Sequence, residues 1–150
     1  MILPLLIALL QSANFTGLWK LDKQSSDLPY VFELVDEYTL KVEHYDDKLS
    51  LEIEFSVKGR TVKGQKESYL INGSAQTSKD VRGVQITRSV RSDGDKLLIS
   101  SEKIFAGMLQ LPTINELQEW SLSTDSKTLT ITVSDINNPT SKQKRVFKKY

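Results

Sequence analysis

The chain has 150 residues, with 20 Lys and Arg against 19 Asp and Glu, so its formal net charge is +1. This length is that of one domain and is sufficient to bury a hydrophobic core. The near-zero charge argues against a dedicated nucleic-acid binder, because such a protein needs a basic surface. The absence of cysteine excludes disulfides and thiolate metal sites, so packing and hydrogen bonds alone must hold the fold.

The N-terminal segment is strongly apolar. Residues 1–10 are almost wholly apolar and are followed by Gln11, Ser12 and Ala13. An apolar run with a small residue behind it is typical of a secretory signal peptide, and it is shorter than the roughly 20 residues that a transmembrane helix needs. We therefore expect a signal peptide over 1–13, a folded domain over 14–150, and an exported protein, periplasmic or secreted. An uncleaved N-terminal helix or tail is the alternative.

The first strand is predicted over residues 14–22. Phe15, Trp19 and Leu21 fall on one face at period two, with mostly polar residues on the other. Gly17 lies two residues before the tryptophan. A glycine at this place lets a second backbone pass close by while the indole fills the end of a barrel.

The rest of the chain is predicted to consist almost entirely of strands. Residues 23–29 have the composition of a loop, and residues 30–36 predict one helical turn or a loop lid. Residues 74–82 are ambiguous and fit a strand with an irregular edge. Turn signals include Asn72-Gly73 and Asp93-Gly94-Asp95. Alternating apolar and polar residues predict strands over 38–43, 49–58, 67–71, 84–90, 96–105, 114–122, 129–133 and 142–150.

Strands that recur every 8–12 residues or so, with short turns between them, are typical of an antiparallel barrel or sandwich. Consecutive hairpins favour an up-and-down barrel, and closing the barrel removes exposed sheet edges. The predicted fold class is therefore all-β: a single antiparallel up-and-down β-barrel of about 8–10 strands. A β-sandwich is the alternative.

Five segments together resemble small exported bacterial lipocalin-like proteins: residues 15–22, 93–100, 119–123, 127–131 and 145–147. The resemblance implies a lipocalin-like, calycin-like barrel and no particular biochemical activity. Lipocalins carry a Gly-x-Trp motif on the first strand, with a late basic side chain packed over the indole. Gly17 and Trp19 match this motif, and Arg145 is the candidate for the basic residue that closes the barrel. Such a contact is worth about 0.5–2 kcal/mol. The chain departs from lipocalins in lacking cysteines and a C-terminal helix.

A candidate ligand site follows from the residues expected to face the barrel interior. Arg88 lies two residues from both Ile86 and Val90, so the pleat of the strand places it on the apolar face. An inward guanidinium can hold a ligand carboxylate by two charge-assisted hydrogen bonds. The alternatives are a structural pair with Glu116 or Glu119, or a bulge that interrupts the apolar face. The predicted ligand-binding residues are Tyr38, Leu40, Phe55, Ile86, Arg88 and Trp120.

These features favour an exported monomer that binds a small apolar or amphipathic ligand. One alternative is a barrel packed solid that acts as an envelope interaction module, through its outer face or residues 30–36. The other is a barrel enzyme, an isomerase or hydrolase with Glu116 or Glu119 as acid or base. No catalytic motif is present, so we expect no enzymatic activity. His44 is the single histidine and cannot build a zinc site by itself. We expect no metal, no cofactor, no nucleic acid partner and no transmembrane segment.

Overall fold

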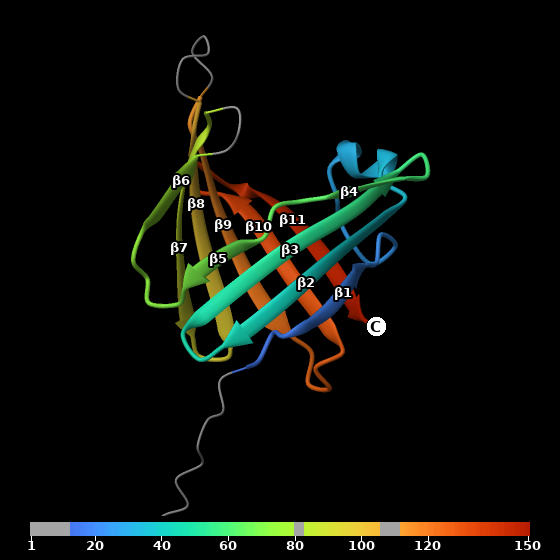
Figure 1. The fold of residues 1–150 in the computed structure, drawn as a ribbon, viewed down its shortest axis with the longest axis horizontal. Coiled ribbons are helices and arrows are strands. Elements are labelled where there is room, and N and C mark those ends of the chain that lie inside the picture. The colour runs from blue at the N-terminus through green and yellow to red at the C-terminus, as the bar shows by residue number, and fades with distance from the viewer. Residues whose placement is uncertain (1–12, 80–82, 106–111) are drawn as a thin grey trace, which may run out of the picture.

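The computed structural model describes residues 13–79, 83–105 and 112–150. All but the last residue of the predicted signal peptide, 1–13, therefore lies outside the described residues. The described residues form eleven strands and one short 3-10 helix (Figure 1). In chain order these are β1 (Gly17–Leu21), η1 (Tyr30–Leu34), β2 (Glu37–Tyr45), β3 (Lys48–Val57), β4 (Arg60–Lys63), β5 (Glu67–Leu70), β6 (Gln76–Lys79), β7 (Gln85–Asp93), β8 (Lys96–Ile104), β9 (Ile114–Leu122), β10 (Thr128–Asp135) and β11 (Asn138–Lys149).

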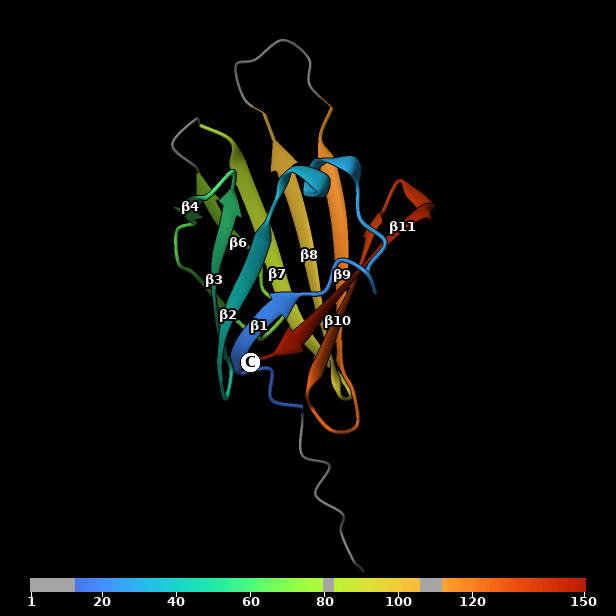
Figure 2. The ribbon, with the colours of Figure 1, turned by 90° about the vertical axis from the view of Figure 1, so that its right-hand side faces the viewer.

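The strands form one antiparallel sheet that curls into a barrel. The sheet order is β4-β3-β2-β1-β11-β10-β9-β8-β7-β6, with β5 paired to β3. Most neighbours in the sheet are consecutive in the chain, and the pairing of β1 with β11 brings the two ends of the domain together. The curl is visible from both directions (Figure 1 and Figure 2). The predicted up-and-down barrel is confirmed, and the sandwich alternative is wrong.

Two short elements refine the prediction. No strand is predicted between residues 58 and 67, yet Arg60–Lys63 forms β4 on the edge of β3. All four of its side chains are exposed, so no burial pattern marks this strand in the sequence. The helical turn predicted over 30–36 is confirmed as the 3-10 helix Tyr30–Leu34. In the described part of the chain, no helix has the length and hydropathy that a membrane crossing requires.

The core is built from the inward-facing residues of successive strands, as period-two alternation requires. Trp19, Leu49, Val90 and Leu129 are fully shielded from solvent. Leu40 of β2 lies directly opposite Trp19 of β1, so neighbouring strands contribute side chains to the same layer of the core. Burying each such side chain contributes about 1.5–3 kcal/mol of hydrophobic stabilisation.

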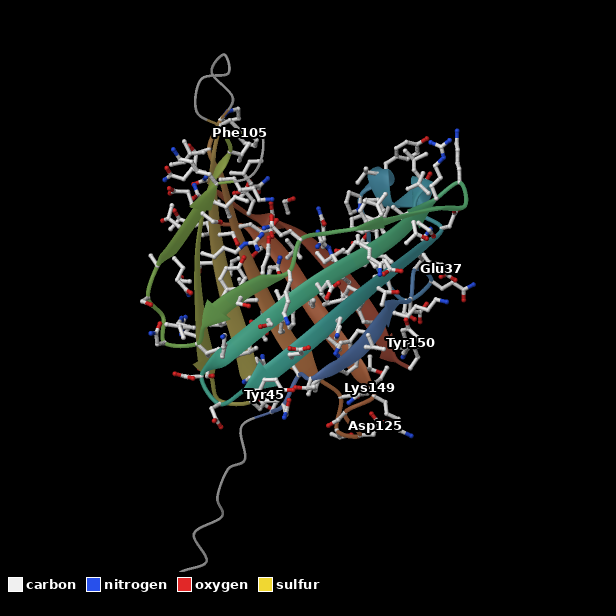
Figure 3. All side chains as sticks on the ribbon, in the orientation of Figure 1. Glu37, Tyr45, Phe105, Asp125, Lys149 and Tyr150 are labelled. Atoms are coloured by element: carbon white, nitrogen blue, oxygen red, sulfur yellow. The ribbon has the colours of Figure 1, made fainter. Side chains whose placement is uncertain are left out.

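One end of the barrel is closed by Trp19, Phe15 and Lys149. The indole nitrogen of Trp19 donates a hydrogen bond to the Phe15 carbonyl oxygen at 2.9 Å. The Phe15 ring packs edge-on against Trp120, with 6.0 Å between the ring centres. The Lys149 ammonium nitrogen lies 5.3 Å from the centre of the Trp19 ring. Figure 3 labels Lys149 at this end and Phe105 at the opposite end.

The expectation that Arg145 covers the Trp19 indole is wrong. In the β1–β11 register, Trp19 lies directly opposite Lys149, and Arg145 is about 13 Å farther along the strand. The Arg145 guanidinium carbon instead lies 5.2 Å from the centre of the Phe32 ring. The basic residue over the Gly-x-Trp motif is therefore Lys149.

The barrel wall has a seam between β5 and β6. In residues 13–79 and 83–105, no backbone ladder joins these two strands. At one end of the seam, the Gly73 amide donates to the Val90 carbonyl oxygen at 2.8 Å, beside an isolated bridge between Ile71 and Val90. The Gln76 side chain also crosses the seam. It accepts a hydrogen bond from the Leu70 amide at 3.1 Å and donates one to the Leu70 carbonyl oxygen at 3.4 Å.

Candidate functional site: a cavity inside the barrel

A cavity of about 120 Å³ lies inside the barrel. The buried side chains of the core occupy the rest of the interior, and the cavity is the space that they leave. The strands β2, β3, β5 and β7 to β11 contribute to its lining. The apolar lining consists of Leu40, Leu51, Ile53, Ile99, Trp120, Ile131 and Phe147, and the polar lining of Tyr38, Glu67, Tyr69, Arg88, Gln118 and Arg145. The barrel is therefore not packed solid.

Four of the six residues predicted to bind ligand line this cavity, namely Tyr38, Leu40, Arg88 and Trp120. The other two, Phe55 and Ile86, lie on the inward-facing side of their strands but outside the cavity lining. Phe55 borders a shallow groove near the end of β3, and Ile86 borders an opening at the seam. Alternation identifies the inward-facing positions, but it does not indicate how far the cavity extends along the barrel.

Arg88 of β7 is held by a hydrogen-bonded cluster on the cavity wall. Its Nη1 donates to the Glu67 carboxylate and to the Tyr69 hydroxyl, the latter at 2.6 Å. Its Nε donates to the Ser101 hydroxyl at 3.1 Å. The Tyr69 hydroxyl donates to Glu67 Oε2 at 2.8 Å, and burial raises the pKa of Tyr69 to about 12. The phenol therefore remains a donor at neutral pH.

The ion-pair partner of Arg88 is Glu67. The alternative predicted from the sequence, a structural pair with Glu116 or Glu119, is therefore wrong. Glu67 lies on β5 and Arg88 on β7, so the ion pair crosses the seam between strands that share no ladder. Glu119 lies on the outer face of β9, where it accepts a hydrogen bond from Lys96 at 2.8 Å. Glu119 therefore does not face the barrel interior, where the enzyme alternative requires its acid or base.

Arg145 of β11 is the second guanidinium on the cavity wall. Its Nε is buried and has no hydrogen-bond partner in the described residues. Its Nη2 donates a long hydrogen bond, 3.5 Å, to Gln143 Oε1, and no ion pair with a carboxylate is present within the described ranges. Burial raises the pKa of the neighbouring Tyr38, and the charge of Arg145 acts in the opposite direction. Arg145 is predicted from the sequence to close the barrel, and its place in the cavity wall is not predicted.

A chain of hydrogen bonds runs along the inner face of β9. The Trp120 indole nitrogen donates to Gln118 Oε1 at 2.9 Å, and Gln118 Nε2 donates to Glu116 Oε1 at 2.8 Å. Gln118 lines the cavity, and this chain fixes the direction of its amide. These three side chains of β9 thus bond one another, whereas the Nε of Arg145 has no acceptor in the part of the chain that the structure describes.

An opening of about 300 Å³ lies at the seam, lined by residues of β5 and β6. Glu67 and Tyr69 line both this opening and the interior cavity. The Arg88 cluster therefore stands between the cavity and the outside of the barrel.

Comparisons with known proteins relate the chain to others by structure. No family model and no curated protein matches the sequence. Among solved structures, secretory abundant heat soluble protein 4 from Ramazzottius varieornatus has a TM-score of 0.64 at 16% identity, over 93% of this chain and 96% of that chain. Lipid binding protein 8 of Caenorhabditis elegans has a TM-score of 0.60 at 15% identity, over 91% of this chain and 95% of that chain. Fatty-acid-binding protein 1 of Echinococcus granulosus has a TM-score of 0.58 at 14% identity, over 90% of this chain and 96% of that chain.

The chain shares its fold with the fatty-acid-binding proteins. Each comparison covers at least 90% of this chain and at least 95% of the other chain, so the likeness extends over the whole barrel. At such identities the likeness concerns the fold, and the calycin-like, lipocalin-like architecture implied by the sequence is confirmed at that level.

Proposed function

We propose that this barrel binds a small amphipathic molecule in its interior. The polar head, a carboxylate or another hydrogen-bond acceptor, faces Arg145, and the apolar part packs against Trp120 and Ile131. The observation that carries the proposal is the buried Nε of Arg145, a residue of the cavity lining, which has no hydrogen-bond acceptor in the described residues.

A buried donor without an acceptor is costly. Leaving such a group unsatisfied costs about 1–3 kcal/mol, and more when the group is charged. Orphaned buried donors are rare in folded proteins, because nearly every such group finds an acceptor in the protein, a water or a ligand. A ligand acceptor at this position removes the cost, and the charge of Arg145 favours an anion there.

The cavity volume limits the ligand to a small one. Ligand sites usually span about 300–1,000 Å³, whereas this cavity has about 120 Å³. An apolar cavity of about 150 Å³ is known to hold benzene. A ligand of about six non-hydrogen atoms fits this range, and a binding free energy of about 4–6 kcal/mol corresponds to a Kd between about 1 mM and about 40 μM.

Comparison with the solved structures supports the proposal at the level of ligand class. One similar protein is named as a lipid binding protein and another as a fatty-acid-binding protein. An anionic head group with an apolar tail matches the chemistry of the cavity of this chain, where Arg145 lies directly across from Ile131 and the lining also includes Trp120 and Phe147.

The test is a pair of matched probes, butanoate and butanamide, titrated into the protein and followed by NMR. The two differ in charge and hardly in shape. We expect butanoate to bind more tightly and to shift the Arg145 Nε–H signal. In Arg145→Met the butanoate affinity falls about tenfold, the loss of one charged hydrogen bond, while butanamide changes little. Lys144→Met is the control, because Lys144 precedes Arg145 on β11 and is exposed.

Two results would contradict the proposal. One is that neither probe binds the wild-type protein at millimolar concentration. The other is that both substitutions reduce butanoate binding equally, since a cation on the outer face has no contact with the cavity.

We also propose that the protein is exported, because residues 1–13 have the composition of a signal peptide. The intact mass of protein recovered from its source tests this part independently of ligand binding. A mass that corresponds to a chain starting at Asn14 supports export, and a mass that retains residues 1–13 contradicts cleavage.

A further inference from the structure

The cavity contains two arginines in different states. Arg145 has no carboxylate partner in the described part of the chain, whereas Arg88 is paired with Glu67. We propose that Glu67 is a resident counter-ion in a second anion site, formed by Arg88, Tyr69 and Ser101, and that it determines which head groups the cavity accepts. This inference rests on the proposed function, because it concerns the selectivity of the same cavity.

The donors around Glu67 have the chemistry of a carboxylate site. Arg88 Nη1 and the Tyr69 hydroxyl both donate to the same oxygen, Glu67 Oε2. The Tyr69 hydroxyl is also bonded by Arg88 at 2.6 Å, and Ser101 holds the Arg88 Nε at 3.1 Å. A guanidinium and a phenol oriented in this way are strong donors to carboxylates. The carboxylate that they bind here belongs to the protein itself.

The position of Glu67 allows its side chain to rotate away from Arg88. Its side chain is 39% exposed, against 18% for Arg88. It borders both the cavity and the opening at the seam. Rotation of the Glu67 side chain toward the seam returns its charge to water, and this hydration offsets part of the loss of its bonds to Arg88 and Tyr69, whereas Arg88 stays inside. An incoming carboxylate can then take the oxygen position that Glu67 vacates, and Arg88 remains neutralised.

The charges of the cavity lining lead to a definite expectation. With Glu67 in place, Arg88 and Glu67 cancel, and Arg145 remains as the uncompensated cation among the lining residues that the structure describes. Removing the charge of Glu67 leaves two uncompensated guanidinium groups facing the cavity. Because Glu67 competes with the ligand for Arg88, its removal strengthens the binding of anions and has little effect on neutral molecules.

The test compares Glu67→Gln with wild type, again with butanoate and butanamide. Gln keeps the size of the side chain and removes its charge. We expect butanoate to bind E67Q about tenfold more tightly, the gain of one charge-assisted hydrogen bond, with butanamide affinity unchanged. The Nε–H signals of Arg88 and Arg145 report the position of the anion. In E67Q both shift with butanoate, and in wild type the Arg145 signal shifts more.

Glu54→Gln is the matched control. Glu54 lies on the outer face of β3, where it pairs with Lys63 at 3.6 Å, and its substitution removes the same charge from outside the barrel. If E54Q and E67Q gain the same affinity for butanoate, net charge explains the effect and the inference is overturned. Should E67Q not fold, Glu67→Asp keeps the charge and shortens the side chain, and we expect a smaller gain in the same direction.

A purely structural role for Glu67 predicts a different outcome. The ion pair crosses the seam, so its loss lowers thermal stability whether or not Glu67 competes with a ligand. The ratio of butanoate to butanamide affinity does not depend on that effect. A ratio equal to that of wild type overturns the inference while leaving the proposed function intact. If wild type binds neither probe but E67Q binds butanoate at Arg88, the inference holds and the proposed function fails; if neither protein binds, both fail.

Discussion

The ammonium nitrogen of Lys149 lies 5.3 Å from the centre of the Trp19 ring, and the two residues are direct partners across β1 and β11. Trp19 is fully buried, so this cation covers the indole at the end of the barrel. Gly17 makes the arrangement possible. A Cβ atom added to Gly17 would lie 2.8 Å from Lys149 Cε and 3.3 Å from the indole nitrogen of Trp19.

Gly17→Ala is therefore expected to displace the flexible end of the Lys149 side chain and to destabilise the protein by about 0.5–1 kcal/mol, because the cation–indole contact is lost. Urea unfolding of wild type and variant measures the loss. In a Lys149→Ala background the same substitution costs less, since the lysine stem no longer occupies the space. Equal costs in the two backgrounds would show that Gly17 and Lys149 do not interact.

His44 contributes a pH-dependent contact at the same end of the barrel. Its Nδ1 accepts a hydrogen bond from the Phe15 amide at 3.3 Å, which a protonated imidazole cannot do. Burial lowers the pKa of His44 below its ordinary 6.5, and the neighbouring Asp46 opposes the shift. A lowered pKa means that the folded protein resists the proton which the unfolded chain accepts.

Stability attributable to His44 is accordingly complete above pH 6.5 and is lost as the pH falls through the lower folded pKa. His44→Asn retains an acceptor and does not titrate. As the pH falls from about 7.5 to about 5, we expect the free energy of unfolding of wild type to decrease relative to that of H44N. Urea unfolding at several pH values measures it, and a constant difference across this range contradicts the assignment.

The pKa of Tyr69 is raised, whereas that of His44 is lowered. Burial raises its pKa to about 12, so the folded protein holds a proton that the unfolded chain releases near pH 10. The stability that this proton contributes, on the order of 2 kcal/mol, is present below pH 10 and is lost as the pH rises through about 12.

Ultraviolet titration of wild type and Tyr69→Phe isolates this phenol by difference, with an expected midpoint of about 12. In Glu67→Gln the midpoint is expected to fall, because the Glu67 carboxylate raises the pKa of Tyr69. A difference spectrum with a midpoint near that of free tyrosine, about 10, would contradict the buried hydrogen-bonded position.

Most of the fold follows from local patterns in the sequence. Alternation over residues 49–58 and 96–105 predicts strands that the structure confirms as β3 and β8. Alternation also places Tyr38 and Arg88 on inward faces. These predictions succeed because the side-chain period of a strand is a local property, fixed by backbone geometry.

The features that the sequence does not predict depend on distant strands. The residue that covers Trp19 follows from the β1–β11 register, which brings Lys149 there rather than Arg145. The Glu67–Arg88 ion pair crosses a seam between strands without a ladder. A pattern within one strand contains no information on register or on contacts across such a gap. The same holds for the Arg145 Nε, which has no acceptor in residues 13–79, 83–105 and 112–150, since a missing partner depends on all surrounding strands.

The seam itself depends on one side-chain amide. Gln76 accepts from the Leu70 amide at 3.1 Å and donates to the Leu70 carbonyl oxygen at 3.4 Å, which reproduces part of a backbone ladder. In Gln76→Ala both bonds are lost, at about 0.5–1.5 kcal/mol each, and the Leu70 amide becomes open to solvent. We expect its hydrogen exchange to accelerate about tenfold or more, while amides of β8 and β10 keep their wild-type rates.

Thr77→Ala is the control for this last prediction, because Thr77 follows Gln76 on β6 and its hydroxyl contacts Thr87 at 3.0 Å on the exposed side. It should leave the exchange of Leu70 unchanged. Gln76→Glu keeps the acceptor for the Leu70 amide and removes the donor to the carbonyl oxygen, so its rate should lie between those of wild type and Q76A. Acceleration spread evenly over all strands in Q76A would indicate global destabilisation, and the seam would then not be a separately opening part of the wall.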